Sequence, residues 1–120
     1  MNHVSFSGAE VNLNERRLKM PYRVLDAFIS KGVIIVLLDP DSYLRDREYK
    51  QRLQNTGVAL RNLAAFDFEG KRLWEAEFPQ NTDYYYKVSS KEPLIVYSFS
   101  SFECEIDPTS GKIKSKSFFK

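Results

Sequence analysis

The chain has 120 residues, of which 42% are hydrophobic, 28% are charged and 14% are aromatic, and its formal net charge is +2. These values exclude a disordered chain and predict one globular domain over residues 1–120. A charge of +2 is also too small to indicate a polyanionic partner.

Neither membrane insertion nor secretion is indicated by the sequence. The longest apolar run, VIIVLL at residues 33–38, is far shorter than the roughly 18 residues that a membrane helix needs. The first residues do not combine a basic leader with an apolar block, and the single cysteine, Cys104, excludes an intramolecular disulfide. We therefore expect a cytoplasmic protein.

Short strands are predicted in the first third of the chain. Apolar residues alternate in residues 3–8 and 10–14, and each segment stops at turn-forming residues. Residues 22–30 and 33–39 flank a glycine-bearing connection that suits a hairpin. The second of these segments is apolar on both faces, which predicts a central strand covered on both sides.

A charged insertion interrupts the strands at about residues 41–56. It has no strand period, and Asp41 or Ser42 is a suitable cap for a helix that runs to about Gln54 and stops at Asn55-Thr56-Gly57. A mobile insertion is the alternative, because the apolar stripe of this segment is weak.

The second half of the chain predicts further strands, separated by turns rich in Gly, Pro and Asp. Their lengths and spacings are typical of an antiparallel all-β domain. The predicted strands lie within residues 60–68, 71–78, 84–90, 93–100, 102–107 and 112–119.

Two segments of the chain are similar to each other. AFDFEGKRLWEAEF, which begins at Ala65, matches EIDPTSGKIKSKSF, which begins at Glu105, so that Asp67 corresponds to Asp107. In each turn the Asp side chain is expected to accept backbone N–H bonds and the glycine to adopt a positive φ. In the last hairpin we also expect Glu and Lys side chains to face each other across the strands.

This repeat resembles a β-propeller blade of the pyrroloquinoline-quinone type. The residues that carry the resemblance are NLAAFDFEGKRLWEAEF, with Trp74 near its end, and FECEIDPTSGKIKSKSF. It implies two blade-like sheets, at about 20–78 (with the insertion at 39–57) and about 84–119. Because two blades cannot close a ring, we expect an antiparallel meander of two sheets packed on one core. The alternatives are an open stack of two blades and closure as a homodimer. No quinone site follows, since that cofactor needs a complete propeller.

The whole chain resembles a family of small, uncharacterised bacterial all-β proteins. The shared features are a Tyr-Arg strand from Tyr22, the VIIVLLDP strand, the Asp-x-x-Gly-Lys-x-x-Trp hairpin from Asp67 and the tail at 101–120. Some members resemble components of bacterial toxin and immunity systems. The resemblance therefore implies an immunity or accessory role for this chain.

Residues suited to catalysis or cofactor binding are scarce. The only histidine is His3, in the first few residues, and Cys104 alternates with Phe102 and Ile106 as a core residue should. One His and one Cys do not make a zinc site, and the glycines occur singly at turns rather than in a phosphate-binding loop. We therefore expect a protein without enzymatic activity, metal or cofactor.

Binding to another protein is the function that the sequence favours. Three consecutive tyrosines on a strand cannot all point to one side, so either Tyr85 alone or the pair Tyr84 and Tyr86 points outward, in a patch near Trp74. The insertion could steer an acidic partner. The alternative is a nucleic-acid or small-ligand binder, with nucleic acid less favoured because the second half is rich in Asp and Glu. The candidate partner-binding residues are Arg45, Arg47, Lys50, Arg52, Tyr84, Tyr85 and Tyr86.

Overall fold

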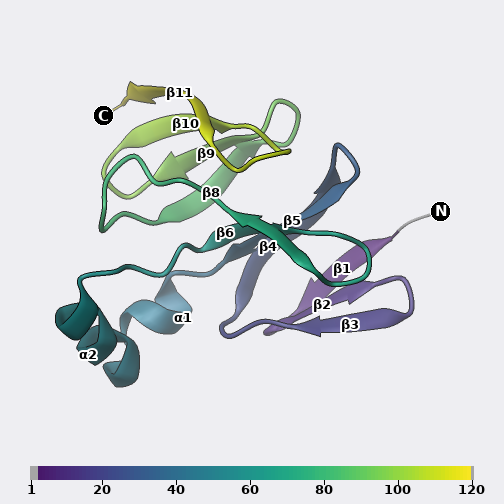
Figure 1. The fold of residues 1–120 in the computed structure, drawn as a ribbon, viewed down its shortest axis with the longest axis horizontal. Helices are drawn as coiled ribbons and strands as arrows, with labels where there is room; N and C mark the ends of the chain where they lie inside the picture. Colours follow the sequence, from purple (N-terminus) through teal and green to yellow (C-terminus); the bar gives the residue numbers. More distant parts are fainter. Residues whose placement is uncertain (1–2, 120) are drawn as a thin grey trace.

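The computed structural model of the protein describes residues 3–119. Most of the regular secondary structure consists of antiparallel strands, which form three separate sheets (Figure 1). The predicted antiparallel β class is therefore confirmed. The structure has three sheets, however, where the sequence led us to expect two.

The first sheet is a meander of β1 (Val4–Ser7), β2 (Glu10–Leu13) and β3 (Arg16–Lys19). Its first two strands were predicted, but β3 was not, because Leu18 is its only apolar residue. Val11 and Leu13 of β2 are buried, so the sheet has one inward face.

The second sheet contains β4 (Val24–Ser30), β5 (Val33–Leu38), β6 (Leu63–Phe66) and β7 (Arg72–Glu75), in that order. The two helices of the insertion lie between β5 and β6 in the chain. The third sheet contains the next strands in the order β11-β10-β9-β8. These strands are β8 (Tyr85–Ser90), β9 (Ile95–Ser98), β10 (Phe102–Ile106) and β11 (Ile113–Phe118).

The β4–β7 sheet is the middle layer of the molecule. One of its faces packs on the β8–β11 sheet, and the other packs on the β1–β3 sheet and the helices (Figure 1). Side chains of β5 alternate between the two cores: Ile35 and Leu37 point to the first, and Ile34 and Val36 to the second. The prediction that this strand is covered on both faces is confirmed. The two four-stranded sheets share one core, and the second core, on the other face of the middle sheet, was not expected.

The insertion is helical and packs on the middle sheet. It forms α1 (Asp41–Leu44) and α2 (Arg47–Thr56), which differ from the single predicted helix because Asp46 has an extended backbone, with φ −73° and ψ 126°. Neither helix has a side-chain cap, so the proposed capping by Asp41 or Ser42 is wrong. The predicted stop is confirmed, since Gly57 ends α2 with φ 68°.

The two similar turns have the predicted hydrogen bonds. Asp67 Oδ1 accepts the backbone N–H groups of Glu69 and Lys71, each at 2.9 Å. Asp107 Oδ1 likewise accepts the backbone N–H of Thr109 at 2.9 Å, and this bond is the main reason that the pKa of Asp107 is lowered. Both turn glycines have positive φ, 89° at Gly70 and 77° at Gly111.

The last hairpin has a register different from the expected one. A bulge between Glu105 and Ile106 places Ser115 opposite Glu105 and Ser117 opposite Glu103. Glu and Lys residues therefore do not face each other directly, although Lys114 Nζ still reaches Glu105 Oε2 at 3.2 Å. The bulge alters the alternation on which the sequence prediction depended.

Candidate functional site: an aromatic cleft between two sheets

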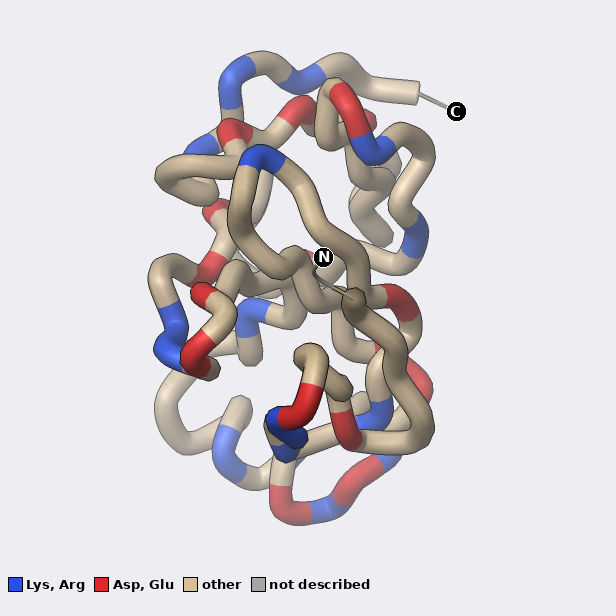
Figure 2. Tube along the Cα trace, turned by 90° about the vertical axis from the view of Figure 1, so that its right-hand side faces the viewer, with Lys and Arg blue, Asp and Glu red and all other residues tan. Residues whose placement is uncertain are grey.

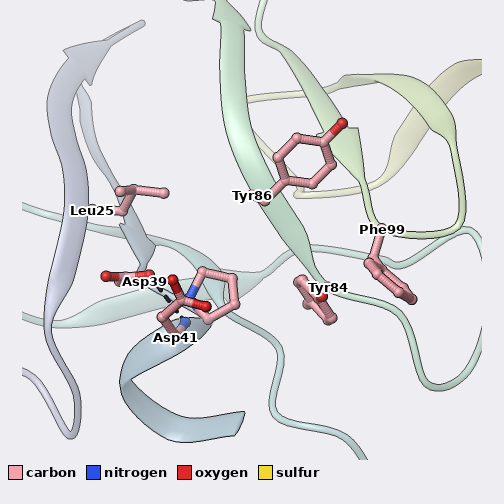
Figure 3. A pocket seen from close by; sticks show the side chains of 7 residues that line it. Leu25, Asp39, Asp41, Tyr84, Tyr86 and Phe99 are labelled. Carbon is pink, nitrogen blue, oxygen red and sulfur yellow. Dashed lines mark hydrogen bonds between the residues drawn. The ribbon is translucent and has the colours of Figure 1, made fainter.

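A cleft of about 390 Å³ opens between the two four-stranded sheets, beside the first residues of β4 and β8. One wall comes from β4, the end of β5 and α1, and the other from residues around β8 and β9 (Figure 3). We call it the aromatic cleft, and its lining residues are Leu25, Asp39, Pro40, Asp41, Tyr84, Tyr86 and Phe99.

The aromatic wall of the cleft is preassembled. The rings of Tyr84 and Phe99 are stacked, with their centroids 5.0 Å apart and their planes 19° from parallel. The backbone N–H of Phe99 donates to the Tyr84 carbonyl at 2.9 Å, which fixes the spacing of the two residues. Phe99 is nevertheless 65% exposed and Tyr86 is 39% exposed. The aromatic surface is therefore held by the fold and remains open to solvent.

Asn62 anchors this wall to the middle sheet. Its side chain is almost completely buried, and its Nδ2 donates to the carbonyls of Leu38 at 2.9 Å and Tyr85 at 2.7 Å. Its Oδ1 accepts the Tyr85 backbone N–H at 3.1 Å. The start of β8 is thus bonded to the end of β5, so the two walls of the cleft are held in a fixed relation.

A buried carboxylate supports the same wall from behind. Asp83 Oδ1 accepts the backbone N–H of Tyr84 at 2.8 Å and that of Ser100 at 3.1 Å, and its Oδ2 accepts the Ser100 hydroxyl. These bonds tie the chain before β8 to the turn after β9. Because Phe99 lies on that turn, Asp83 positions both stacked rings.

The opposite wall is acidic. Asp39 Oδ2 accepts hydrogen bonds from Nε and Nη2 of Arg23, at 3.0 and 2.5 Å. Asp39 Oδ1 accepts a hydrogen bond from the Asp41 backbone N–H at 3.0 Å. The charge of Asp39 is therefore balanced by Arg23. The exposed carboxylate of Asp41 has no ion pair within residues 3–119 and lies at the cleft.

Tyr84 lies between these two kinds of side chain. Burial raises the pKa of its phenol, and the negative charges of Asp41 and Asp83 raise that pKa further. The phenol is thus neutral at neutral pH, and it can both donate a hydrogen bond and present its ring to a ligand.

The structure separates the tyrosines into two roles. Tyr85 is completely buried, and its hydroxyl donates to the Glu77 carbonyl at 2.5 Å. Tyr84 and Tyr86 line the cleft, so of the two orientations left open by the sequence the second is found, and Tyr85 is not a surface residue. Trp74 is buried against Gly111 and is not part of this surface.

The basic candidates lie elsewhere. Arg45 follows α1, and Arg47, Lys50 and Arg52 lie on α2; all are exposed. None of them lines the aromatic cleft. Arg52 instead borders a second cleft, of about 770 Å³, that lies beside Tyr22 and Asp46. The structure therefore does not bring the basic and tyrosine candidates into one site.

Five of the seven residues that line the cleft were not among the site residues predicted from the sequence. They are Leu25, Asp39, Pro40, Asp41 and Phe99. Leu25 and Phe99 occur in alternating segments, in which apolar residues are expected to be buried. Asp41 was interpreted as a helix cap. The one available signal was the turn after Phe99, since a large aromatic residue beside serines at a strand end is often accessible.

Features that support catalysis are sparse in the part of the chain that the structure describes. Within it, no group of three or more His, Cys, Asp or Glu residues is placed to hold a metal ion. Cys104 is completely buried, and burial raises the pKa of its thiol, which makes it a poor nucleophile.

Within residues 3–119, each helix is too short or too polar to traverse a lipid bilayer.

Comparison with known proteins gives a family assignment. Neither the curated proteins nor the solved structures contain a match to the chain. Residues 1–118 match a family described as a domain of unknown function, DUF7957. Because the match extends over nearly the whole sequence, the protein belongs to the DUF7957 family.

Proposed function

We propose that the protein is a non-catalytic protein-binding module, and that its aromatic cleft accepts a lysine or arginine side chain of the partner. The observation that carries this proposal is the position of exposed aromatic rings opposite the unpaired carboxylate of Asp41. Aromatic faces attract cations, and a carboxylate supplies the matching charge.

The properties of the cleft suit a protein partner. Exposed aromatic residues commonly dominate the binding energy of protein interfaces, and rigid ones lose little entropy on binding. The aromatic surface also continues beyond the cleft, since Tyr97 lies 6.4 Å from Tyr86 and 4.9 Å from Phe119, measured between ring centroids. A partner chain that inserts one basic side chain would therefore find further apolar contacts nearby.

The biological setting of this module is part of the same proposal. We infer that the two four-stranded sheets are copies of one blade-like unit, and the similar hydrogen bonds of the Asp67 and Asp107 turns support this. The resemblance to bacterial all-β proteins supports an immunity or accessory role in the cytoplasm. For such a role, a toxin with a basic surface is the partner chemistry that fits the cleft.

A nucleic-acid binder is the second candidate, favoured by one observation. Arg45, Arg47 and Lys50 are exposed and make no ion pair within the described residues. Against it, basic and acidic residues are interspersed over the molecule, as Figure 2 shows, and no uniformly basic face is presented in that view. Oligonucleotide binding that weakens steeply with salt and is lost on replacing these residues with Ala would favour this candidate.

Titration with short peptides tests the proposed function. A peptide with one central arginine and an otherwise identical peptide with glutamate are added to the isotope-labelled protein, and amide NMR shifts are followed. The arginine peptide should shift amides near Tyr84, Tyr86 and Phe99 in a saturable manner. Asp41→Asn and Phe99→Ala should each weaken its affinity by about fivefold or more.

Arg47→Ala is the matched control, because Arg47 is exposed and does not line the cleft. It should leave the affinity for the arginine peptide unchanged. Equal shifts with the two peptides, or full affinity in the Asp41 and Phe99 variants, would refute the proposed cation site.

A further inference from the structure

A second cleft separates the same two sheets at their other end. It has a volume of about 340 Å³ and lies where the turn after β4 meets the turn after β8. We call it the turn cleft. The aromatic cleft adjoins the first residues of these strands, so the two clefts lie at opposite ends of β4 and β8. The residues of the turn cleft that matter here are Ser30, Lys31, Lys91, Glu92, Glu105 and Lys114.

Ser30, one of the residues that line this cleft, has a buried hydroxyl without a hydrogen-bond partner among the described residues. The residue is only 2% exposed. Phe28, which lies two residues earlier on β4, belongs to the core between the two sheets. Because side chains two apart on a strand share a face, the Ser30 hydroxyl points to the same inter-sheet side, and Ser30 is one of the residues that line the cleft. A buried hydroxyl without a partner is unfavourable unless a ligand or water completes it.

Three lysines line the same cleft as Ser30. Lys91 Nζ lies 5.0 Å from the centroid of the Phe28 ring, a cation–π contact that restrains the ammonium group. Lys31 also lines the cleft and has no ion pair within the described residues. The charge of Lys114 is neutralised by Glu105, since Lys114 Nζ lies 3.2 Å from Glu105 Oε2.

The balance of charge favours an anionic ligand. Of the charged residues that line the cleft, Lys31, Lys91 and Glu92 make no ion pair within residues 3–119, which leaves one excess positive charge. Ammonium groups only donate hydrogen bonds, and the Ser30 hydroxyl can donate as well. A ligand that contacts all of them must be rich in acceptor oxygens and negatively charged.

We propose that the turn cleft binds a small oxyanion, a phosphate or carboxylate group of a free small molecule. The Ser30 hydroxyl donates to one oxygen, and Lys31 and Lys91 neutralise the charge. The volume of the cleft is at the lower end of those of known small-molecule pockets, so it suits one such group with a short attached moiety. This site does not depend on the aromatic cleft or on the function proposed for it.

Anion titration of the whole protein tests the proposal. Inorganic phosphate and acetate are added at constant ionic strength, with chloride as the reference, while amide shifts and the melting temperature are measured. Phosphate, acetate or both should shift the amides of Ser30, Lys31 and Lys91 in a saturable manner and raise the melting temperature. The anion with the higher affinity identifies the class of ligand.

Two variants distinguish the site from a general effect of salt. Ser30→Ala and Lys91→Gln should each reduce anion affinity by about fivefold or more. Since the Ser30 hydroxyl has no protein partner, Ser30→Ala should not lower the melting temperature in anion-free buffer. Lys112→Gln, an exposed lysine that does not line this cleft, should bind the anion as the wild type does.

Several results would overturn the proposal. Shifts that do not saturate, or that match those in chloride, would show that no oxyanion site exists. Unchanged anion affinity in both variants would show that Ser30 and Lys91 do not bind the anion. A lower melting temperature of Ser30→Ala without anion would show that the hydroxyl has a structural role, completed by a buried water.

Discussion

Gly111 and Trp74 meet where the two four-stranded sheets join, and the contact leaves no room for a side chain at position 111. An added Cβ would lie 2.4 Å from Cε3 of the Trp74 ring, and the backbone there has φ 77°. At Gly70 the corresponding Cβ would lie 3.2 Å from Cδ1 of Leu18, a contact that a small movement relieves. The two turns are similar in hydrogen bonding but differ in how much space surrounds them.

Alanine substitutions at three glycines separate the backbone strain from the steric clash. We expect Gly111→Ala to lower the free energy of unfolding by about 3 kcal/mol, and Gly70→Ala by about 1 to 2 kcal/mol. Gly8→Ala is the control, since Gly8 has φ 58° and open space around it and reports the backbone term alone. Urea denaturation measures all three. Equal losses at Gly8 and Gly111 would contradict the tight contact with Trp74.

For single residues, the sequence predicted the roles that depend only on neighbours in the chain. The Asp-to-glycine turns were identified because both the carboxylate and the positive φ act within a few residues. The role of Asn62 was not predicted, because its hydrogen-bond partners Leu38 and Tyr85 are 24 and 23 residues away. Only the packed sheets bring these groups together.

The insertion is the element whose behaviour the sequence left open. In the structure α2 packs on the rest of the protein through Tyr49, which is 5% exposed. The hydroxyl of Tyr49 accepts the backbone N–H of Leu60 at 3.0 Å, so it also fixes the chain that leads into β6. Packing of this kind is not expected of a mobile insertion.

Tyr49→Phe tests whether α2 is docked in this way. The variant removes the hydroxyl and leaves the half-buried N–H of Leu60 without its acceptor, so we expect unfolding to require about 1 kcal/mol less. Tyr86→Phe serves as the control, because the hydroxyl of that exposed tyrosine makes no hydrogen bond within the described residues. If the insertion were mobile, urea denaturation would give the same free energy of unfolding for both variants as for the wild type.

Strands were predicted far better than their pairing. Alternating apolar residues and turn residues indicated all strands except β3, in which Leu18 is the only apolar residue. Pairing in the last hairpin was mispredicted because the bulge between Glu105 and Ile106 leaves no clear sequence signal. The break between α1 and α2 at Asp46 was likewise not predicted, since a single extended residue interrupts an otherwise helical segment.

For the molecule as a whole, two buried tyrosines make stability depend on alkaline pH. Tyr43 and Tyr85 are 1% and 0% exposed, and burial strongly raises the pKa of each phenol above its usual value. Below about pH 10 both phenols are neutral in the folded and unfolded states, and their contribution to stability is complete. Above that pH the unfolded chain releases protons that the folded protein retains, so stability falls.

We expect the free energy of unfolding to fall above pH 10 by about 1.4 kcal/mol per pH unit for each of these tyrosines. Urea denaturation midpoints measured from about pH 8 to about pH 11.5 would show the decline, because this range extends to both sides of the ordinary tyrosine pKa of about 10. Tyr43→Phe should reduce the slope by the share of one tyrosine, without loss at pH 8, because the Tyr43 hydroxyl has no partner within residues 3–119. An unchanged slope would show that Tyr43 ionises freely in the folded protein.

The arrangement of the sheets was beyond what the sequence could predict. Both clefts lie between β4 and β8 and therefore exist only because the middle and third sheets pack on each other. The repeat indicated similar units but not the β1–β3 sheet that covers the other face of the middle layer. Side-chain packing over long sequence distances decides these features, and periodicity does not report it.

The order of strands within the sheets has a consequence for synthesis of the chain. Each sheet consists of strands that follow one another in sequence, so each can pair as soon as its own segment has left the ribosome. The inner face of the β1–β3 sheet nevertheless stays uncovered until β4 and β5 emerge. The opposite face of β5 is covered only after β9 and β10 have emerged. A nascent chain that has released β5 but not yet β9 and β10 would therefore expose one face of the most apolar strand of the protein to solvent.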